Sequence, residues 1–150
     1  MRSDVDAMRL ALVQAARAAM EGEVPVGAVV VGPDGAVLGE GRNRREAQHD
    51  PLAHAEVVAL RDAARATGGW RLDRCTLVAT LEPCTMCAGA VLESRIDRLV
   101  FGAWDAKAGA VGSVLDVLRD RRVGARVEVV PGVLADECAA VLAGFFGPLR

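Results

Sequence analysis

The run TLVATLEPCTMCAGAVLES, residues 76–94, predicts a β-strand that leads into an α-helix. Its first part, Thr76 to Leu81, has the length and apolar character of a buried strand. Its second part, Cys84 to Ser94, follows a helical pattern. Cys84 and Cys87 lie three residues apart at the start of that helix, and residues three apart share one helix face. The helix therefore presents two thiols side by side.

The same two patterns alternate along the rest of the chain. Apolar residues at steps of three and four predict a helix from about Asp4 to Glu21, with Ser3 as its candidate cap. Beyond it the patterns predict strands at Val26 to Val31 and Ala36 to Gly41 around the turn Gly32-Pro33-Asp34-Gly35, a helix from His54 to about Gly68, a strand at Arg98 to Phe101, a helix at Ser113 to Arg119, a strand at Val127 to Val130, and a helix at Ala135 to Phe146 that ends before Gly147-Pro148.

This order of elements predicts an α/β fold. The two strands around the tight turn pair antiparallel, whereas the strand-helix-strand units of the second half imply parallel pairing with right-handed crossovers. We expect a three-layer α/β/α architecture, in which a mixed five-stranded sheet carries helices on both faces. A chain of 150 residues fits one domain, residues 1–150, and no linker, repeat or low-complexity tract divides it.

The composition limits the classes of partner. A net charge of −2 and a pI of about 5.7 do not indicate a nucleic-acid-binding protein, so a polyanion must be bound by local clusters. Lys107 is the only lysine among 18 Lys and Arg. Arginine suits bidentate phosphate contacts, although genomic base composition explains such a bias more simply. Three arginine clusters are candidates for such local contacts with phosphate: Arg42/Arg44/Arg45, Arg95/Arg98 and Arg119/Arg121/Arg122.

Cysteine usage and hydropathy bear on the compartment. Four unevenly spaced cysteines do not form the framework of a secreted disulfide scaffold. The N-terminus is charged, and no apolar run reaches the roughly 18 residues that a membrane helix needs. We therefore expect a cytoplasmic protein that has no membrane partner.

The motif His54-Ala55-Glu56 adds a third metal ligand to the two cysteines. Structural zinc normally takes four protein side chains, whereas catalytic zinc takes three and leaves one position for water. His54, Cys84 and Cys87 make three, which predicts a catalytic Zn²⁺ site. Hydrolytic attack on an aromatic carbon also needs a proton carrier. Glu56 is placed to face the water without binding the metal.

Two other interpretations of the cysteines are open. Cys84-x-x-Cys87 alone would suit a redox pair at a helix start, but the His-x-Glu motif weighs against that. A structural zinc site would need a fourth ligand, for which Cys75, Cys138 and His49 are the unused candidates. The two cysteines stand in apolar surroundings, where buried inert thiols are the usual explanation.

The two motifs together resemble a known signature. His54-Ala55-Glu56, followed after residues 57–82 by Pro83-Cys84-Thr85-Met86-Cys87, is similar to the zinc-dependent cytidine and deoxycytidylate deaminase superfamily. The surrounding residues resemble, more narrowly, the bacterial tRNA-specific adenosine deaminases: Glu23-Val24-Pro25-Val26-Gly27-Ala28, Gly41-Arg42-Asn43-Arg44, His49-Asp50-Pro51, Thr80-Leu81-Glu82-Pro83, Ala88-Gly89-Ala90 and Asp105-Ala106-Lys107-x-Gly109.

The resemblance implies hydrolytic deamination of adenosine to inosine at the wobble position of an arginine tRNA anticodon stem-loop. Bases in an RNA loop are unpaired and cost little to evert. It also implies a homodimer with one Zn²⁺ per subunit, for which the apolar helix after His54 is the candidate interface. The implied roles are zinc ligation by His54, Cys84 and Cys87, proton transfer by Glu56, purine binding by Asn43 and the Ala55 backbone, pocket lining by Val24 and Leu81, and contact with flanking nucleotides by Asp105 and Lys107.

Trp104 departs from the family pattern, which has a basic residue there, so we expect RNA binding either to be weaker or to rely on the arginine clusters and on a base stacked on Trp104. Two alternative functions stay open. A deaminase of a free nucleobase or nucleoside, such as guanine or cytosine, would share the zinc motifs, but the segment Asp105 to Ser113 favours the tRNA enzyme. A non-catalytic zinc-stabilised RNA-binding module would have no use for a proton shuttle, so Glu56 argues against it.

Overall fold

The structure is a computed structural model that describes residues 1–123 and 126–147. Its five strands form one sheet in the order β2-β1-β3-β4-β5, in which β1 is antiparallel to both neighbours and β3, β4 and β5 are parallel. The elements are α1 (Asp4–Met20), β1 (Gly27–Val31), β2 (Val37–Arg42), α2 (Arg45–Gln48), α3 (Ala55–Thr67), β3 (Thr76–Leu81), α4 (Thr85–Glu93), β4 (Arg98–Ala103), the 3₁₀ turn η1 (Arg121–Val123), β5 (Glu128–Val130) and α5 (Ala135–Phe146).

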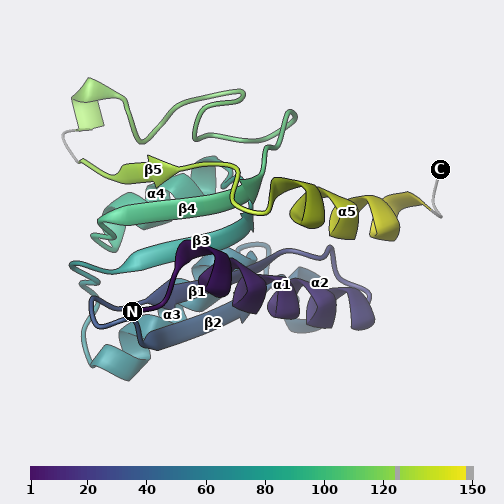
Figure 1. The fold of residues 1–150 in the computed structure, drawn as a ribbon, viewed down its shortest axis with the longest axis horizontal. Coiled ribbons are helices and arrows are strands. Elements are labelled where there is room, and N and C mark those ends of the chain that lie inside the picture. Colours follow the sequence, from purple (N-terminus) through teal and green to yellow (C-terminus); the bar gives the residue numbers. More distant parts are fainter. Residues whose placement is uncertain (124–125, 148–150) are drawn as a thin grey trace.

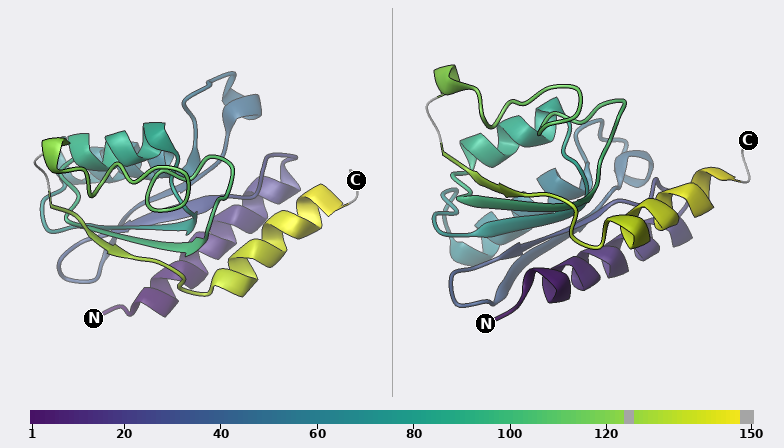
Figure 2. Two further views of the ribbon diagram at one scale, coloured as in Figure 1. Left: turned by 90° about the horizontal axis from the view of Figure 1, so that it is seen from above. Right: turned by 45° about the horizontal axis from the view of Figure 1, so that its top comes forward.

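The sheet is the middle of three layers. Helices α1 and α5 lie on one face, and α3 and α4 lie on the other, as Figure 1 and Figure 2 show. Side chains along the central strands alternate between two cores, with Leu77 and Phe101 facing α3 and α4 while Val78 and Val100 face α1 and α5. Both faces of these strands are buried, which explains their nearly continuous apolar sequence. The predicted three-layer architecture with a mixed sheet is confirmed.

Helix boundaries follow the residues that cap them. The Ser3 hydroxyl accepts a hydrogen bond from the Asp6 amide at 3.1 Å, so the predicted cap of α1 is confirmed. Gly68 adopts a left-handed conformation with φ +77° and ends α3. His54 and Cys84 are the N-cap residues of α3 and α4, and neither side chain caps its own helix. Both side chains are therefore available for other contacts.

Helix α3 packs unusually close to the edge strand β2. A Cβ at Gly41 would lie 2.3 Å from the Ala55 carbonyl oxygen, and one at Gly39 would lie 2.5 Å from the Ala59 carbonyl oxygen. Only glycine leaves room for this approach. The contact brings the first turn of α3 down onto the sheet.

One predicted helix is wrong. Residues Ser113 to Arg119 belong to an irregular loop that begins before them, because Val111 and Asp116 make an isolated bridge and Gly112 has φ +137°. The amide of Ser113 is bonded to the Glu82 carboxylate, a long-range contact that local sequence patterns do not reveal. The four-residue helix α2 was not predicted. Helix α5 ends at Phe146 as expected, whereas Pro148 lies outside the described residues.

None of the described helices is long and apolar enough to cross a bilayer.

Candidate active site

The candidate site lies at the edge of the sheet that is formed by strand ends, where β2, β3 and β4 finish and β1 begins, and not along an edge strand. Because β1 is antiparallel to β2 and β3, the start of β1 meets the ends of the other two strands at this edge. The end of β4 lies there too, since β4 runs parallel to β3 and Leu81 pairs with Ala103. The segments that follow β2, β3 and β4 consequently converge on a single place. This is the edge at which α/β proteins commonly bind their ligands.

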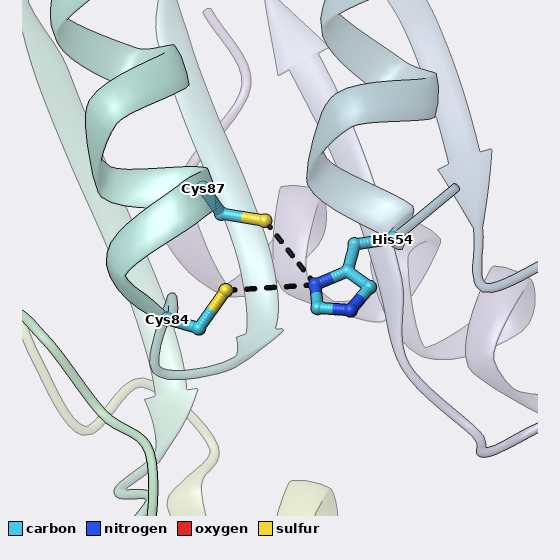
Figure 3. Close-up of side chains that lie close together, drawn as sticks. All are labelled: His54, Cys84 and Cys87. Atoms are coloured by element: carbon cyan, nitrogen blue, oxygen red, sulfur yellow. Dashed lines mark hydrogen bonds between the residues drawn. The ribbon is translucent and has the colours of Figure 1, made fainter. Parts of the chain in front are cut away.

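Three metal-ligating side chains meet at this edge (Figure 3). The His54 Nδ1 atom lies 3.6 Å from the Cys84 Sγ atom and 3.5 Å from the Cys87 Sγ atom. All three donor atoms lie within 4.8 Å of one another. His54 comes from the start of α3, and the two cysteines come from the start of α4. The structure thus brings together the three residues that the sequence proposed as ligands.

The spacing of the donor atoms fits a tetrahedral zinc ion. With a Zn–S bond of roughly 2.3 Å, a Zn–N bond of roughly 2.0–2.1 Å and a tetrahedral angle, the nitrogen and sulfur atoms lie about 3.5–3.6 Å apart. The observed distances of 3.5 and 3.6 Å agree with that value. Among the described residues no fourth His, Cys, Asp or Glu joins the group. The donor set therefore leaves one coordination position free of protein.

The two thiols hold their protons very differently. A hydrogen bond from Cys87, supported by His54, lowers the pKa of the Cys84 thiol to about 3. The same contact with Cys84, together with burial, raises the pKa of the Cys87 thiol far above its ordinary value. Hydrogen bonding to Cys84 also raises the pKa of His54. Metal ligation needs both cysteines as thiolates, so binding of a dication would release the Cys87 proton.

Glu56 lies beside this group without belonging to it. Its Oε2 atom accepts a hydrogen bond from the Cys87 thiol at 3.0 Å, and its side chain is buried. Burial raises the pKa of this carboxyl, against the opposing hydrogen bond from Cys87. A carboxyl within hydrogen-bond reach of the reacting groups can take up and give back a proton. Glu56 therefore has the position expected of a proton carrier.

A cavity of about 170 Å³ opens beside the three ligands. It is smaller than the roughly 300–1,000 Å³ pockets that enclose drug-sized ligands, so it suits a single flat base. Most of the substrate-binding residues proposed from the sequence line it, namely Val24, Asn43, Ala55, Leu81 and Asp105. Lys107 does not line the cavity and is exposed on the same loop as Asp105.

Asn43 is held in one orientation at the cavity wall. Its side chain is buried, and its Oδ1 atom accepts a hydrogen bond from the Arg45 amide at 3.2 Å. The acceptor of the side-chain amide is therefore engaged by the backbone. The Nδ2 group keeps its two N–H donors for a ligand.

These observations coincide with comparisons to known proteins. Residues 1–103 match the family model described as the cytidine and deoxycytidylate deaminase zinc-binding region. The tRNA-specific adenosine deaminase of Haemophilus influenzae is 51% identical over 151 residues, which cover 99% of this chain and 87% of that protein. The chain belongs to the tRNA-specific adenosine deaminase family. The predicted resemblance is confirmed.

Solved structures agree with this assignment. The deaminase is similar to a structure from a study of A-to-I editing by tRNA:A34 deaminases at the wobble position, with a TM-score of 0.87, 43% identity and coverage of 91% of this chain and 98% of that one. It is also similar to a guanine deaminase from Nitrosomonas europaea, with a TM-score of 0.82, 28% identity and coverage of 98% and 86%. Deaminases of RNA and of a free base thus share this architecture.

Sequence reasoning did not single out every residue at the cavity of this deaminase. Arg45, Ala108 and Glu82 also line it. In the sequence Arg45 stands out only as one member of an arginine cluster, and its position two residues after Asn43 is the signal that points to the site. Glu82 follows an apolar strand and immediately precedes the Pro-Cys motif, where a carboxylate needs a structural reason.

The remaining histidine and cysteines of the deaminase, His49, Cys75 and Cys138, do not belong to the group of three candidate metal ligands. Cys75 is buried in the core under α3 and α4, and Cys138 is buried in the core on the opposite face of the sheet. His49 is exposed at the end of α2. Trp104 is 52% exposed and packs against Phe101, with 5.0 Å between the ring centroids, so part of its surface remains accessible beside the cavity loop.

Proposed function

We propose that this deaminase converts adenosine to inosine at the wobble position of a tRNA anticodon, with one zinc ion per chain. The observation that carries the proposal is the base-sized cavity, which meets a three-donor metal group and a buried carboxylate at one place. Membership of the tRNA-specific adenosine deaminase family supports the RNA substrate. A chain that works on tRNA would act in the cytoplasm.

The residues of the chain divide the reaction between them. Asn43 donates hydrogen bonds to the everted base, and the Ala55 backbone lies at the same wall of the cavity. Zinc held by His54, Cys84 and Cys87 would lower the pKa of water, so that a hydroxide nucleophile is available near neutral pH. Glu56 takes one proton of the attacking water and delivers it to the purine ring nitrogen. It then takes the second proton, from the hydroxyl formed at the attacked carbon, and passes it to the amino group, which leaves as ammonia. Water and adenosine thereby give inosine and ammonia.

Arg45 supports a nucleotide substrate. It lines the cavity and is exposed, and within the described chain it forms no ion pair. Arg42, by contrast, is paired with Glu21. An unpaired guanidinium at the cavity mouth can contact the phosphate beside an everted base. We propose that Asp105 and Lys107 meet the flanking nucleotides on the other loop, and that the tRNA is an arginine tRNA.

A second copy of the chain is part of the proposal. Helices α3 and α4 form an apolar surface groove lined by Val57, Leu60, Ala64, Trp70 and Ala90, of which Trp70 is 60% exposed. Contiguous exposed apolar surface of this kind marks a protein interface. We propose that the homodimer forms there.

The small cavity would also accommodate a free base. One assay separates an enzyme that acts on RNA from one that acts on free bases. Zinc-loaded protein is incubated with an arginine tRNA anticodon stem-loop and, separately, with free adenine, guanine, adenosine and cytidine. Inosine and ammonia are then quantified. We expect inosine in the stem-loop and little turnover of the free compounds. Turnover of a free base without inosine in the stem-loop would refute the proposal.

A further inference from the structure

Besides Glu56, two further carboxylates are buried close to the cavity: Glu82 lines it, and Glu23 immediately precedes Val24, which lines it. Glu23 and Glu82 are 3% and 2% exposed. Each immediately precedes a part of the site in the sequence, Val24 in one case and Pro83-Cys84 in the other. A buried carboxylate is costly unless hydrogen bonds satisfy its oxygen atoms. Both carboxylates accept hydrogen bonds from a segment distant in the sequence, which is helix α2 for Glu23 and the loop of residues 105–113 for Glu82.

Glu82 gathers the loop between Asp105 and Ser113. Its two oxygen atoms accept hydrogen bonds from the amides of Asp105 at 2.9 Å, Val111 at 3.0 Å and Ser113 at 3.1 Å, and also from the Ser113 hydroxyl. A Cβ at Gly109 would lie 2.2 Å from the Glu82 Oε1 atom, so this loop closes around the carboxylate with no space left over. One side chain thus organises nine residues of backbone.

The same loop forms part of the cavity. Asp105 and Ala108 line it, and the Ala108 amide in turn bonds to the Asp105 Oδ1 atom at 3.2 Å. Glu82 therefore determines where the Asp105 side chain stands relative to a bound base.

Glu23 holds helix α2 in the same way that Glu82 holds the 105–113 loop, and the residues next to α2 form another wall of the cavity. Its carboxylate accepts hydrogen bonds from the amides of Glu46 at 3.1 Å and Ala47 at 2.9 Å, in the first turn of α2. The N-cap residue of α2, Arg44, offers no side-chain cap, so Glu23 satisfies these free amides instead. The turn held in this way begins with Arg45, whose amide fixes Asn43.

We propose that Glu23 and Glu82 are positioning residues that set two walls of the substrate cavity. Glu23 acts through α2 on Asn43 and Arg45, and Glu82 acts through the 105–113 loop on Asp105 and Ala108. The inference rests on the proposed function for its substrate, but the division of the two walls between two carboxylates stands on the hydrogen bonds alone.

Glutamine in place of either glutamate tests the assignment. The amide keeps the shape of the side chain but turns one acceptor oxygen into a donor that faces backbone N–H groups. Leaving such buried groups unsatisfied shifts the loop. We expect the KM for the stem-loop to rise about tenfold in either variant, the magnitude expected for one or two lost hydrogen bonds. The kcat should fall much less, because α3 still holds Glu56, and zinc content should be unchanged.

The experiment compares zinc-loaded Glu23→Gln and Glu82→Gln with wild type and with Glu137→Gln. Glu137 is the matched control because it lies on α5, pairs with Arg9 and is 51% exposed. Hydrogen exchange of backbone amides gives a readout independent of activity. Amides 45–47 should exchange faster only in Glu23→Gln, and amides 105–113 only in Glu82→Gln. Kinetics on the stem-loop and zinc content are measured on the same preparations.

Three results would overturn the inference. They are a wild-type exchange pattern with a wild-type KM, a uniform loss of protection across the whole sheet in both variants, and a loss of zinc. Wild-type protein without activity on the stem-loop would instead refute the proposed function. In that case the reciprocal exchange pattern still decides whether each carboxylate holds its own wall.

Discussion

The Cys87 Sγ atom lies 3.0 Å from the Glu56 Oε2 atom, although Glu56 is not one of the three residues of the ligand group. The two residues belong to the first turns of different helices, α4 and α3. The sheet and the close packing of α3 at Gly41 hold those turns together. The proposed proton carrier and a proposed metal ligand are therefore neighbours only in the folded chain.

Replacing Glu56 by Gln should separate proton transfer from metal binding. Loss of a general acid and base typically costs about 10²–10⁴-fold in rate, so kcat for inosine formation should fall by at least that range. Zinc content, measured by metal analysis of the dialysed protein, should equal that of wild type. A zinc-free Glu56→Gln protein would mean that the carboxylate is a ligand.

Chelation of the metal should abolish activity and lower the melting temperature. A ligand at a free concentration one hundred times its Kd stabilises by about 2.7 kcal/mol, or about 5–10 °C in Tm for a chain of this size. Differential scanning fluorimetry with and without a chelator measures the shift, and added zinc should reverse it. Cys84→Ala is the control, since it should melt at the same temperature with or without the chelator. Equal melting of wild type in both conditions would contradict the assigned site.

Truncation of Arg45 should weaken stem-loop binding in a salt-dependent way. Each phosphate contact to a single strand contributes about 0.7 to the slope of log Kd against log salt, so Arg45→Ala should reduce the slope by about that amount. Binding is measured by fluorescence anisotropy in the Glu56→Gln background, which prevents turnover. Arg17→Ala removes the same charge from exposed surface of α1 and should leave the slope unchanged. Equal slopes for all three proteins would remove Arg45 from the RNA contact.

The ion pair between Asp4 and Arg98 should make stability pH-dependent. Arg98 donates two hydrogen bonds, of 2.6 and 2.7 Å, to the Asp4 carboxylate and so lowers its pKa. A lowered carboxyl pKa adds stability above the ordinary value of about 3.9, and this contribution is lost as the pH falls through the folded-state pKa.

Asp4→Asn should therefore lower the free energy of unfolding by up to about 1 kcal/mol at pH 7, the scale of a partly exposed pair. The difference from wild type should shrink at pH 3. Urea unfolding at the two pH values measures it, and Asp6→Asn, an exposed neighbour on α1, is the control. A difference that stays constant with pH would rule out the ion pair as its source.

Replacement of two glycines by alanine should change the stability of the protein in opposite directions. At Gly41 the added methyl group meets the α3 backbone at 2.3 Å, and overpacking of this kind costs about 1–3 kcal/mol. At Gly89, inside α4, nothing lies within 4 Å, and alanine in a helix is favoured over glycine by about 0.5–1 kcal/mol. Thermal unfolding should rank Gly89→Ala above wild type and wild type above Gly41→Ala. Zinc affinity should fall in Gly41→Ala, because the proposed ligand His54 immediately precedes the first turn of α3.

Regular elements were predictable because their apolar period is a local property. Strand β3 was expected at Thr76 to Leu81 and has those bounds, and the last helix was expected at Ala135 to Phe146 and has those bounds too. The loop after β4 was expected to include a helix at Ser113 to Arg119, and it does not. Its amides bond to Glu82, about thirty residues away in the sequence, and such a contact outweighs local helix propensity.

The sequence by itself determined the residue types available for catalysis. A His-x-Glu motif and a Cys-x-x-Cys motif supply three metal-donor side chains and one further carboxylate, whatever the fold of the chain. The sequence also determined the layers, because apolar periodicity specifies which faces must be buried. Only the tertiary structure decided that the donors meet at 3.5–3.6 Å, that Asn43 faces the same cavity, and that Lys107 stands outside it. Those positions depend on glycine contacts and on hydrogen bonds to buried carboxylates between distant segments, which no local pattern encodes.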